Sequence, residues 1–318
     1  MPGAAADAPR VLECAGGEEA APLGPRGTTL EPVPTTDSSS SSSSSSSPLT
    51  DVEPLASTTV GSGPHRVAFL HGLMGRGRNF TGVANALADD FTLELVDLPD
   101  HGQSPWTDAV DYPGMADRVA EHLRAGLAAD GPVHLLGHSM GGKVAMVLAL
   151  RHPDLVERLV VVDISPRMSP SATDEFVHLL GTMLEMDLGA YSTRAEADAA
   201  MAEHVHDERV RGFLLQNLRR EGGHFSWQPN VRMLFEHLEE VGRFPDPVVP
   251  EDPDRVFDHP VLWLGGEKSD YILDEDVPEM KALFPRVVRV TVRDASHWVH
   301  ADQPEAFVSA VRTFLTAD

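Results

Sequence analysis

Short apolar runs alternate along the chain with stretches whose apolar positions recur at helical spacing, from about Pro64 to the end. This alternation predicts an α/β protein in which crossover helices flank a mostly parallel sheet. The predicted strands cover residues 66–70, 91–96, 133–136, 159–162, 261–264 and 287–292. The predicted helices cover residues 79–88, 115–129, a stretch ending near 150, 278–283 and 304–315.

The alternation breaks after Pro166. Residues from about 169 to 256 contain helical stretches but no convincing strand, and the strand pattern resumes at Val261. A segment of roughly ninety residues between two strands is too long for a simple loop. We therefore expect a helical cap over 169–256, inserted after the strand that ends at Asp163, on a core formed by 58–168 and 257–318.

The first 57 residues lack any such pattern. They mix Ala, Gly, Pro, Thr and acidic residues around an unbroken serine run from Ser38 to Ser47. Because so few apolar side chains cannot offset the entropy lost on ordering, residues 1–57 are predicted to form a disordered tail. Acidic residues outnumber basic ones here and no basic segment precedes an apolar stretch, which disfavours a secretory signal or transit peptide.

Charge and cysteine content narrow the function classes. The chain has 49 acidic and 25 basic residues, a formal net charge of −24, which repels phosphate backbones and anionic lipid. Nucleic acid is therefore not expected as a partner. The single cysteine excludes a disulfide scaffold, a thiolate zinc site and an iron–sulfur cluster. No window approaches the roughly 18 apolar residues of a membrane span, so we expect a soluble, cytoplasmic protein.

The clearest chemical signal is the sequence Gly137-x-Ser139-x-Gly141 between a predicted strand and a predicted helix. Two glycines permit a tight turn that raises the serine hydroxyl above the sheet at a helix N-terminus. A serine nucleophile needs a base, an acid that orients the base, and hydrogen-bond donors for the oxyanion. We predict Ser139 as the nucleophile. The alternative is a small-residue turn that only lets strand and helix pack closely.

The base and the oxyanion donors have candidates at the expected places. His297 follows the last predicted strand, where a loop can return an imidazole to the serine, and it is the predicted general base. His71-Gly72 ends the first core strand, so the next backbone N–H can face the serine. The N–H groups of Leu73 and Met140 are the predicted oxyanion hole.

Two carboxylates compete for the role of the acid. Asp163 and Asp270 both lie between Ser139 and His297, and each follows one of two neighbouring strands, so position does not decide between them. Asp163 follows the apolar run 159–162, where an ionised carboxylate is costly unless it is paired. Asp270 lies in a polar loop where water could solvate it. We favour Asp163 and retain Asp270 as the alternative.

Several segments together resemble the α/β-hydrolase fold, and more narrowly the YbfF-type acyl esterases with the related group of α/β-hydrolase domain-containing protein eleven. These segments are His71–Gly75, Asp100–Ser104, Gly137–Lys143, Asp163–Pro166, Phe213–Leu218, Gly222–Trp227 and His297–His300. The resemblance implies a cofactor-independent serine esterase or thioesterase acting on small acyl esters. It also favours Asp163, since these esterases are understood to take their acid from this strand end.

Other functions stay open on the same scaffold. They are C–C bond hydrolysis, a lyase step, cofactor-free peroxidation, or ligand binding without turnover. A dehalogenase or an epoxide hydrolase would need a carboxylate where Ser139 stands. His204-x-His206 could suggest metal ligands, but an i, i+2 pair on a helix points to different sides. Arg219-Arg220 could pair with a substrate phosphate or carboxylate, although a solvated pair is favoured. No cofactor and no metal are expected, and the sequence leaves the oligomeric state open.

Overall fold

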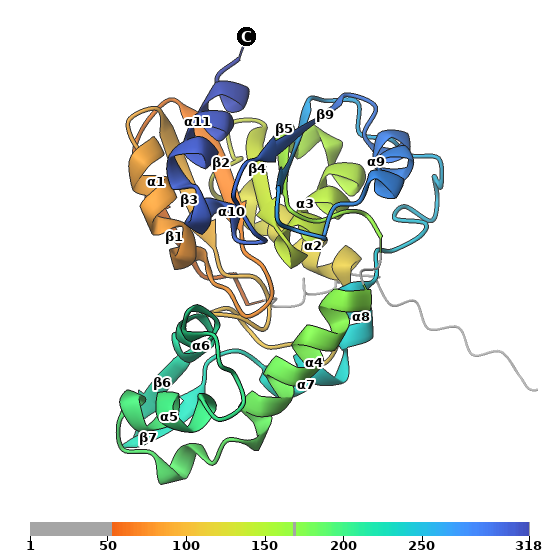
Figure 1. The fold of residues 1–318 in the computed structure, drawn as a ribbon. Helices are drawn as coiled ribbons and strands as arrows, with labels where there is room; N and C mark the ends of the chain where they lie inside the picture. The colour runs from red at the N-terminus through yellow and green to blue at the C-terminus, as the bar shows by residue number, and fades with distance from the viewer. Residues whose placement is uncertain (1–52, 168–169, 318) are drawn as a thin grey trace, which may run out of the picture. The chain divides into compact units, whose positions relative to one another are not determined.

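The computed structural model describes residues 53–167 and 170–317, with backbone alone for 170–174. A seven-stranded sheet runs through these residues in the order β1-β3-β2-β4-β5-β8-β9 (Figure 1). All neighbouring pairs are parallel except β1 and β3. The strands are β1 (Ser57–Val60), β2 (His65–Leu70), β3 (Phe91–Val96), β4 (Val133–His138), β5 (Val156–Val162), β8 (Val261–Gly266) and β9 (Val287–Val292). The predicted mostly parallel α/β sheet is confirmed.

Helices cover both faces of the sheet, and the strand residues divide between two apolar clusters. Ala68 and Leu70 of β2 pack in the cluster that contains α2 and α3, whereas Val67 and Phe69 pack in the cluster that contains α1 and α11. A sheet buried on both faces explains why its strands read as continuous apolar runs. The core helices are α1 (Thr81–Leu87), α2 (Tyr112–Ala125), α3 (Met140–Arg151), α9 (Val277–Leu283), α10 (Val299–Asp302) and α11 (Pro304–Leu315), with short 3₁₀ helices at Gly77–Phe80, Pro153–Leu155 and Asp274–Asp276.

Helix α2 begins three residues earlier than the apolar spacing predicts. The Asp111 side chain accepts a hydrogen bond from the Gly114 N–H at 3.0 Å, and Pro113 occupies the first turn. An aspartate cap followed by proline is a strong start signal, because proline lacks the N–H that would be left unbonded there. The cap thus starts the helix at Tyr112, whose ring is buried in the core, ahead of the predicted start at Met115.

The segment from residue 170 to 256, which we call the insertion, connects β5 to β8. Its elements are α4 (Pro170–Glu185), a 3₁₀ turn (Leu188–Ala190), α5 (Arg194–Met201), α6 (Glu208–Leu215), β6 (Leu218–Glu221), β7 (His224–Trp227), α7 (Val231–Glu236) and α8 (Leu238–Gly242). The expectation of no strand here is wrong, since β6 and β7 form an antiparallel hairpin. Gly222 and Gly223 make its turn with φ of 56° and 92°, which suits a two-residue hairpin loop.

The boundary of the predicted tail also needs correction. Leu55 is buried in the core cluster, and the Ala56 N–H donates to Ser104 Oγ at 2.9 Å. Strand β1 then pairs with β3 from Ser57 onward. Residues 53–57 therefore belong to the fold, because Leu55 is buried, the Ala56 carbonyl accepts the Asp97 N–H at 2.8 Å, and Ser57 pairs with Val96. Residues 1–52 lie outside the described residues.

Among the helices that the structure describes, none combines the length and apolar character needed to cross a membrane.

Removing residues 1–52 should leave the melting temperature and kcat/KM unchanged, because low-complexity serine contributes no packed core. Removing residues 1–60 should lower the melting temperature by several degrees, because it deletes buried Leu55 and exposes the edge of β3. Differential scanning calorimetry of both truncated chains beside the full chain measures this. A loss of several degrees in the first truncation would contradict the prediction.

Candidate active site

Ser139 lies on a strained turn between β4 and α3. Its backbone has φ 53° and ψ −124°, a left-handed conformation that is rare for a residue with a side chain. The turn needs glycine on both sides: a Cβ on Gly137 would lie 2.2 Å from the Gly141 carbonyl oxygen, and one on Gly141 would lie 2.4 Å from the His71 carbonyl oxygen. The Gly-x-Ser-x-Gly spacing is therefore a packing requirement of this turn.

The helix that follows contributes its N-terminus to the site. The carbonyl of Ser139 accepts the N–H groups of Gly142 and Lys143, at 2.8 and 3.2 Å. The N–H of Met140 belongs to the first turn, where no intrahelical acceptor exists. Aligned peptide dipoles also favour negative charge at this end of α3. An oxyanion formed beside Ser139 would therefore meet a donor and a favourable field.

The second predicted oxyanion donor lies in the loop after β2. A Cβ on Gly72 would lie 3.0 Å from the Ser139 Cβ, so this backbone passes directly beside the serine. Within the described chain, the next N–H, that of Leu73, makes no hydrogen bond. Leu73 and Ser139 line the same two cavities. The structure thus brings Leu73 and Met140 to the serine, as the sequence predicts, and their role stays a prediction.

Hydrogen bonds on both sides of Met74 fix this loop. Met74 has φ 59°; its N–H donates to His101 Nε2 at 3.1 Å, and its carbonyl accepts from Asn217 Nδ2 at 2.7 Å. His71 Nε2 likewise accepts the Leu98 N–H at 3.0 Å. Burial lowers the pKa of His71 to about 3 and also lowers the pKa of His101. Both rings are therefore neutral at pH 7 and keep the lone pair that these contacts need.

Asp163 is fully buried at the end of β5 and receives three hydrogen bonds. The Gly266 N–H donates to Oδ1 at 2.9 Å, and the Ser269 hydroxyl and His297 Nδ1 donate to Oδ2, the latter at 2.8 Å. Such donors offset the cost of burying a carboxylate. The contact also fixes the histidine tautomer, with the proton on Nδ1 and the Nε2 lone pair free to accept a proton.

Asp270, the alternative acid, lies elsewhere. It is exposed on the wall of the larger cavity, and within the described residues its side chain forms no hydrogen bond. The structure places Asp163 rather than Asp270 within hydrogen-bond distance of His297. The burial argument made from the sequence likewise favours Asp163 over Asp270.

Two neighbours of His297 were not anticipated from the sequence. His138 Nε2 donates to the His297 carbonyl at 2.9 Å, which ties the histidine loop to the residue before Ser139. Burial holds the pKa of His138 well below its usual range, so the ring is neutral. The Tyr271 ring stacks on the His297 imidazole, with centroids 3.8 Å apart and an interplanar angle of 18°. Both contacts depend on the tertiary fold and have no local sequence signal.

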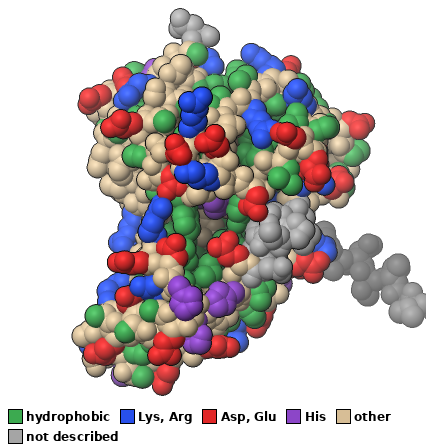
Figure 2. All heavy atoms as spheres, in the orientation of Figure 1, with side chains coloured by type: hydrophobic (Ala, Val, Ile, Leu, Met, Phe, Trp, Pro, Cys, Tyr) green, Lys and Arg blue, Asp and Glu red, His purple; other side chains and the backbone are tan. Residues whose placement is uncertain are grey.

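Two cavities meet at Ser139. The larger has a volume of about 550 Å³ and the smaller one of about 40 Å³. Figure 2 shows apolar side chains and a histidine inside a hollow of the surface, with acidic and basic groups around it. The larger cavity is lined by apolar residues, among them Phe80, Val83, Val210, Phe213 and Trp298, together with charged residues, Glu175, Arg209, Lys268 and Asp270. Such a lining gives a substrate apolar contact area with polar groups beside it.

The remaining candidates do not join this site. The two histidines considered as metal ligands were expected on a helix, but His204 and His206 lie in the turn and loop after α5. In the described part of the chain, no group of three metal-binding side chains occurs. Arg219 pairs with Glu221 at 3.2 Å, and Arg220 donates to the Ser192 carbonyl at 3.0 Å while covering the Phe225 ring. Both arginines are exposed, as favoured above.

A serine on a strained strand-to-helix turn, a histidine paired with a buried aspartate, and a mostly parallel sheet define the α/β-hydrolase class. The chain belongs to this family: residues 66–304 match the family described as alpha/beta hydrolase fold. The resemblance drawn from the sequence is confirmed.

Known relatives agree with this membership. The sn-1-specific diacylglycerol lipase ABHD11 of Danio rerio is 39% identical over 255 residues, which are 78% of each chain. Esterase YbfF of Escherichia coli is 31% identical over 250 residues, 78% of this chain and 92% of its own. The solved structure of a marine microorganism esterase aligns with a TM-score of 0.77 at 32% identity, covering 82% of this chain and 99% of its own.

Acidification should destabilise the protein through His71. Its folded pKa of about 3 lies below the ordinary value of 6.5, so between these pH values the unfolded chain binds a proton that the native chain does not. This contribution to stability is intact above pH 6.5 and falls as the pH drops toward 3. At pH 5 it should have lost about 2 kcal/mol of unfolding free energy.

Urea unfolding of the native chain and of His71→Gln at pH 7.5 and pH 5 tests this, because glutamine can still accept the Leu98 N–H but does not titrate. The variant should lose less unfolding free energy between the two pH values. The same substitution at exposed His224 is the control. Its loss of unfolding free energy between pH 7.5 and pH 5 should equal that of the native chain. Equal losses in the native chain and His71→Gln would refute the assignment.

Proposed function

We propose that this enzyme hydrolyses carboxylic esters or thioesters through an acyl-enzyme formed on Ser139. The observation that carries the proposal is the hydrogen bond between His297 and buried Asp163, in a cavity that His297 shares with the strained Ser139 turn. The names of the relatives, an esterase and a diacylglycerol lipase among them, support ester cleavage.

In the first half-reaction Ser139 Oγ attacks the acyl carbon, and its proton passes to His297 Nε2. The negative charge that develops on the carbonyl oxygen is stabilised by the N–H groups of Leu73 and Met140. Asp163 orients the imidazole and stabilises its protonated form. When the tetrahedral intermediate collapses, the bond to the alcohol or thiol breaks and His297 returns the proton to the leaving group.

In the second half-reaction a water molecule attacks the acyl-enzyme. His297 takes the proton of the water, a second tetrahedral intermediate forms in the same oxyanion hole, and collapse releases the acid and regenerates Ser139. The described residues supply every proton transfer in this sequence. A cytoplasmic location remains part of the proposal, supported by the acidic composition of residues 1–57 and testable by cell fractionation.

A fluorophosphonate probe should label the chain once, at Ser139, and 4-nitrophenyl acetate should give a burst of 4-nitrophenol. Ser139→Ala should abolish both and lower kcat by about four orders of magnitude, because the nucleophile is lost. Intact-mass spectrometry and stopped-flow absorbance measure these effects. A folded chain without label or burst would favour ligand binding without turnover.

The acid is tested by comparing Asp163→Asn with Asp270→Asn. Loss of the orienting carboxylate should lower kcat by three to four orders of magnitude in Asp163→Asn, whereas exposed Asp270→Asn should stay within about tenfold of the native enzyme. Steady-state kinetics give the ratio, and circular dichroism confirms that each variant folds. The reverse ranking would assign the acid to Asp270.

A further inference from the structure

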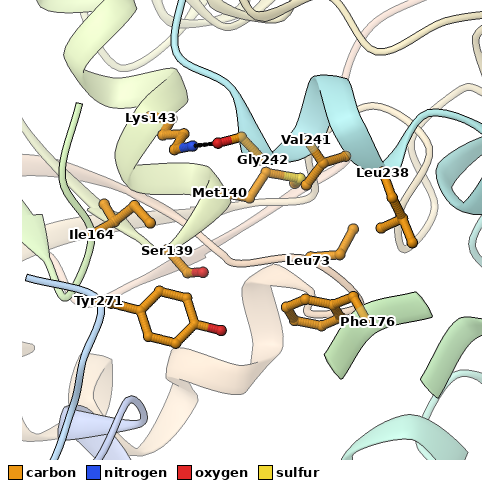
Figure 3. A pocket seen from close by; sticks show the side chains of 10 residues that line it. All are labelled: Leu73, Ser139, Met140, Lys143, Ile164, Phe176, Leu238, Val241, Gly242 and Tyr271. Carbon is orange, nitrogen blue, oxygen red and sulfur yellow. Dashed lines mark hydrogen bonds between the residues drawn. The ribbon is translucent and has the colours of Figure 1, made fainter. Parts of the chain in front are cut away.

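The two cavities at Ser139 differ more than tenfold in volume and share part of their lining. Leu73, Ser139, Phe176 and Tyr271 line both of them. Figure 3 shows the Ser139 hydroxyl directed into the space between Tyr271, Leu73 and Phe176. An ester attacked by this hydroxyl can therefore extend its acyl chain into one cavity and its alcohol into the other.

His297 decides which part of the substrate occupies the larger cavity. The histidine lines the cavity of about 550 Å³ and is not among the described residues that line the smaller one. Its Nε2 must come within hydrogen-bond reach of the leaving oxygen to return the proton. The alcohol is therefore expected on the His297 side, in the larger cavity.

The acyl chain then extends into the smaller cavity. Leu73 and Met140, whose N–H groups face the carbonyl oxygen in the proposed reaction, both line this cavity. Its walls are apolar, with Ile164, Leu238 and Val241 beside the shared ring of Phe176. These walls accept a hydrocarbon chain, and the ammonium group of Lys143, which also lines the cavity, is engaged by backbone carbonyls.

Lys143 closes the far end of the smaller cavity. Its ammonium group donates to the carbonyls of Gly242 and Arg243 at the end of α8, the latter at 3.0 Å (Figure 3). The Tyr112 hydroxyl donates to the Val241 carbonyl at 2.7 Å. Because two core side chains hold the end of α8 against α2 and α3, this wall resists the outward movement that a longer chain would require.

The volume limits the length of the acyl chain. An apolar cavity of roughly 150 Å³ holds benzene, about 25 Å³ per carbon. By the same measure, a cavity of about 40 Å³ holds about two carbons beyond the carbonyl. We infer that the enzyme is selective for esters of short acyl groups, acetyl and propionyl, with large alcohols, and that Val241 and Leu238 set the acyl limit. The inference rests on the proposed function and sets this chain apart from relatives named diacylglycerol lipases.

The first test crosses acyl length with alcohol size. In the 4-nitrophenyl series, kcat/KM should be highest for acetate and propionate and at least tenfold lower for octanoate, since a longer chain overfills this small apolar site. At fixed acetyl, kcat/KM should rise from ethyl to 2-phenylethyl acetate, whose alcohols are similar as leaving groups and differ in size. An octanoate optimum in an enzyme that still forms the Ser139 acyl-enzyme would overturn the inference and leave the proposed function intact. Absence of any Ser139-dependent hydrolysis would overturn both.

The second test uses two half-buried valines of the insertion as a matched pair. Val241 on α8 lines only the smaller cavity, and Val210 on α6 lines only the larger one. Val241→Ala should raise the hexanoate-to-acetate ratio of kcat/KM by about tenfold, because a pocket gains room for a methylene. Val241→Phe should lower the butyrate-to-acetate ratio. Val210→Ala should leave both ratios unchanged and alter only the alcohol series.

A chain-length profile that shifts in Val210→Ala but not in the Val241 variants would place the acyl chain in the larger cavity, contrary to the inference. Acetate turnover and melting temperature, recorded for each variant, separate this outcome from a folding defect. Leu238→Ala removes a larger part of the same cavity wall. It should shift the preferred acyl chain to a greater length than Val241→Ala does.

Discussion

The turn that carries Ser139 depends on backbone segments that approach one another with no side chain between them. Gly141 packs on the carbonyls of Leu70 and His71 at the end of β2, and Gly137 packs on Gly141 itself. Any Cβ at either glycine would come closer than 3 Å to a backbone oxygen, so the backbone would have to move. This contact holds the N-terminus of α3 against the end of β2, and it brings Leu73 and Met140, the proposed oxyanion donors, to the cavity that Ser139 lines.

A second constraint is the buried charge of Asp163. A carboxylate with no exposed surface requires donors, and they come from three separate places along the chain: Gly266 at the end of β8, Ser269 in the next loop, and His297 after β9. Satisfying one buried group therefore brings together the ends of three neighbouring strands. The orientation of the histidine follows from this requirement, because Asp163 is the acceptor for its Nδ1 proton.

Features encoded locally could be predicted from the sequence. The apolar runs identified six strands: the central ones are buried on both faces, whereas β9 was identified from its valines although most of its residues are exposed. The Ser139 turn was evident because its glycines lie within five residues. Strand β1 gave no signal, since its sequence Ser-Thr-Thr-Val is mostly exposed and becomes a strand only by pairing with β3. The hairpin of the insertion was missed for a similar reason, as Leu-Arg-Arg-Glu has only one buried residue. The Gly222-Gly223 pair was the one local sign of it.

The side chains that hold the loop of Leu73 and Met74 could not be predicted, because they come from distant segments of the chain. His101 and Asn217 belong to motifs that the sequence singles out, yet their effect depends on contacts across 27 and 143 residues with a single residue, Met74. Asn217 is fully buried between α6 and β6, and its own carbonyl accepts the Gln228 N–H at 2.9 Å after the hairpin. The hairpin thereby fixes the backbone from which Asn217 reaches the loop.

A second contact from the insertion acts on the same loop. Arg76, two residues beyond Met74, is buried; its guanidinium donates to Gln228 Oε1 at 2.5 Å and to the Gln216 carbonyl at 3.2 Å. Residues on both sides of the hairpin thus hold the segment that carries the Leu73 N–H. Because Met74 has a left-handed backbone, its conformation is costly unless both of its peptide groups are held. The insertion is therefore more than a cover for the substrate, since the geometry of the proposed oxyanion hole depends on its folding.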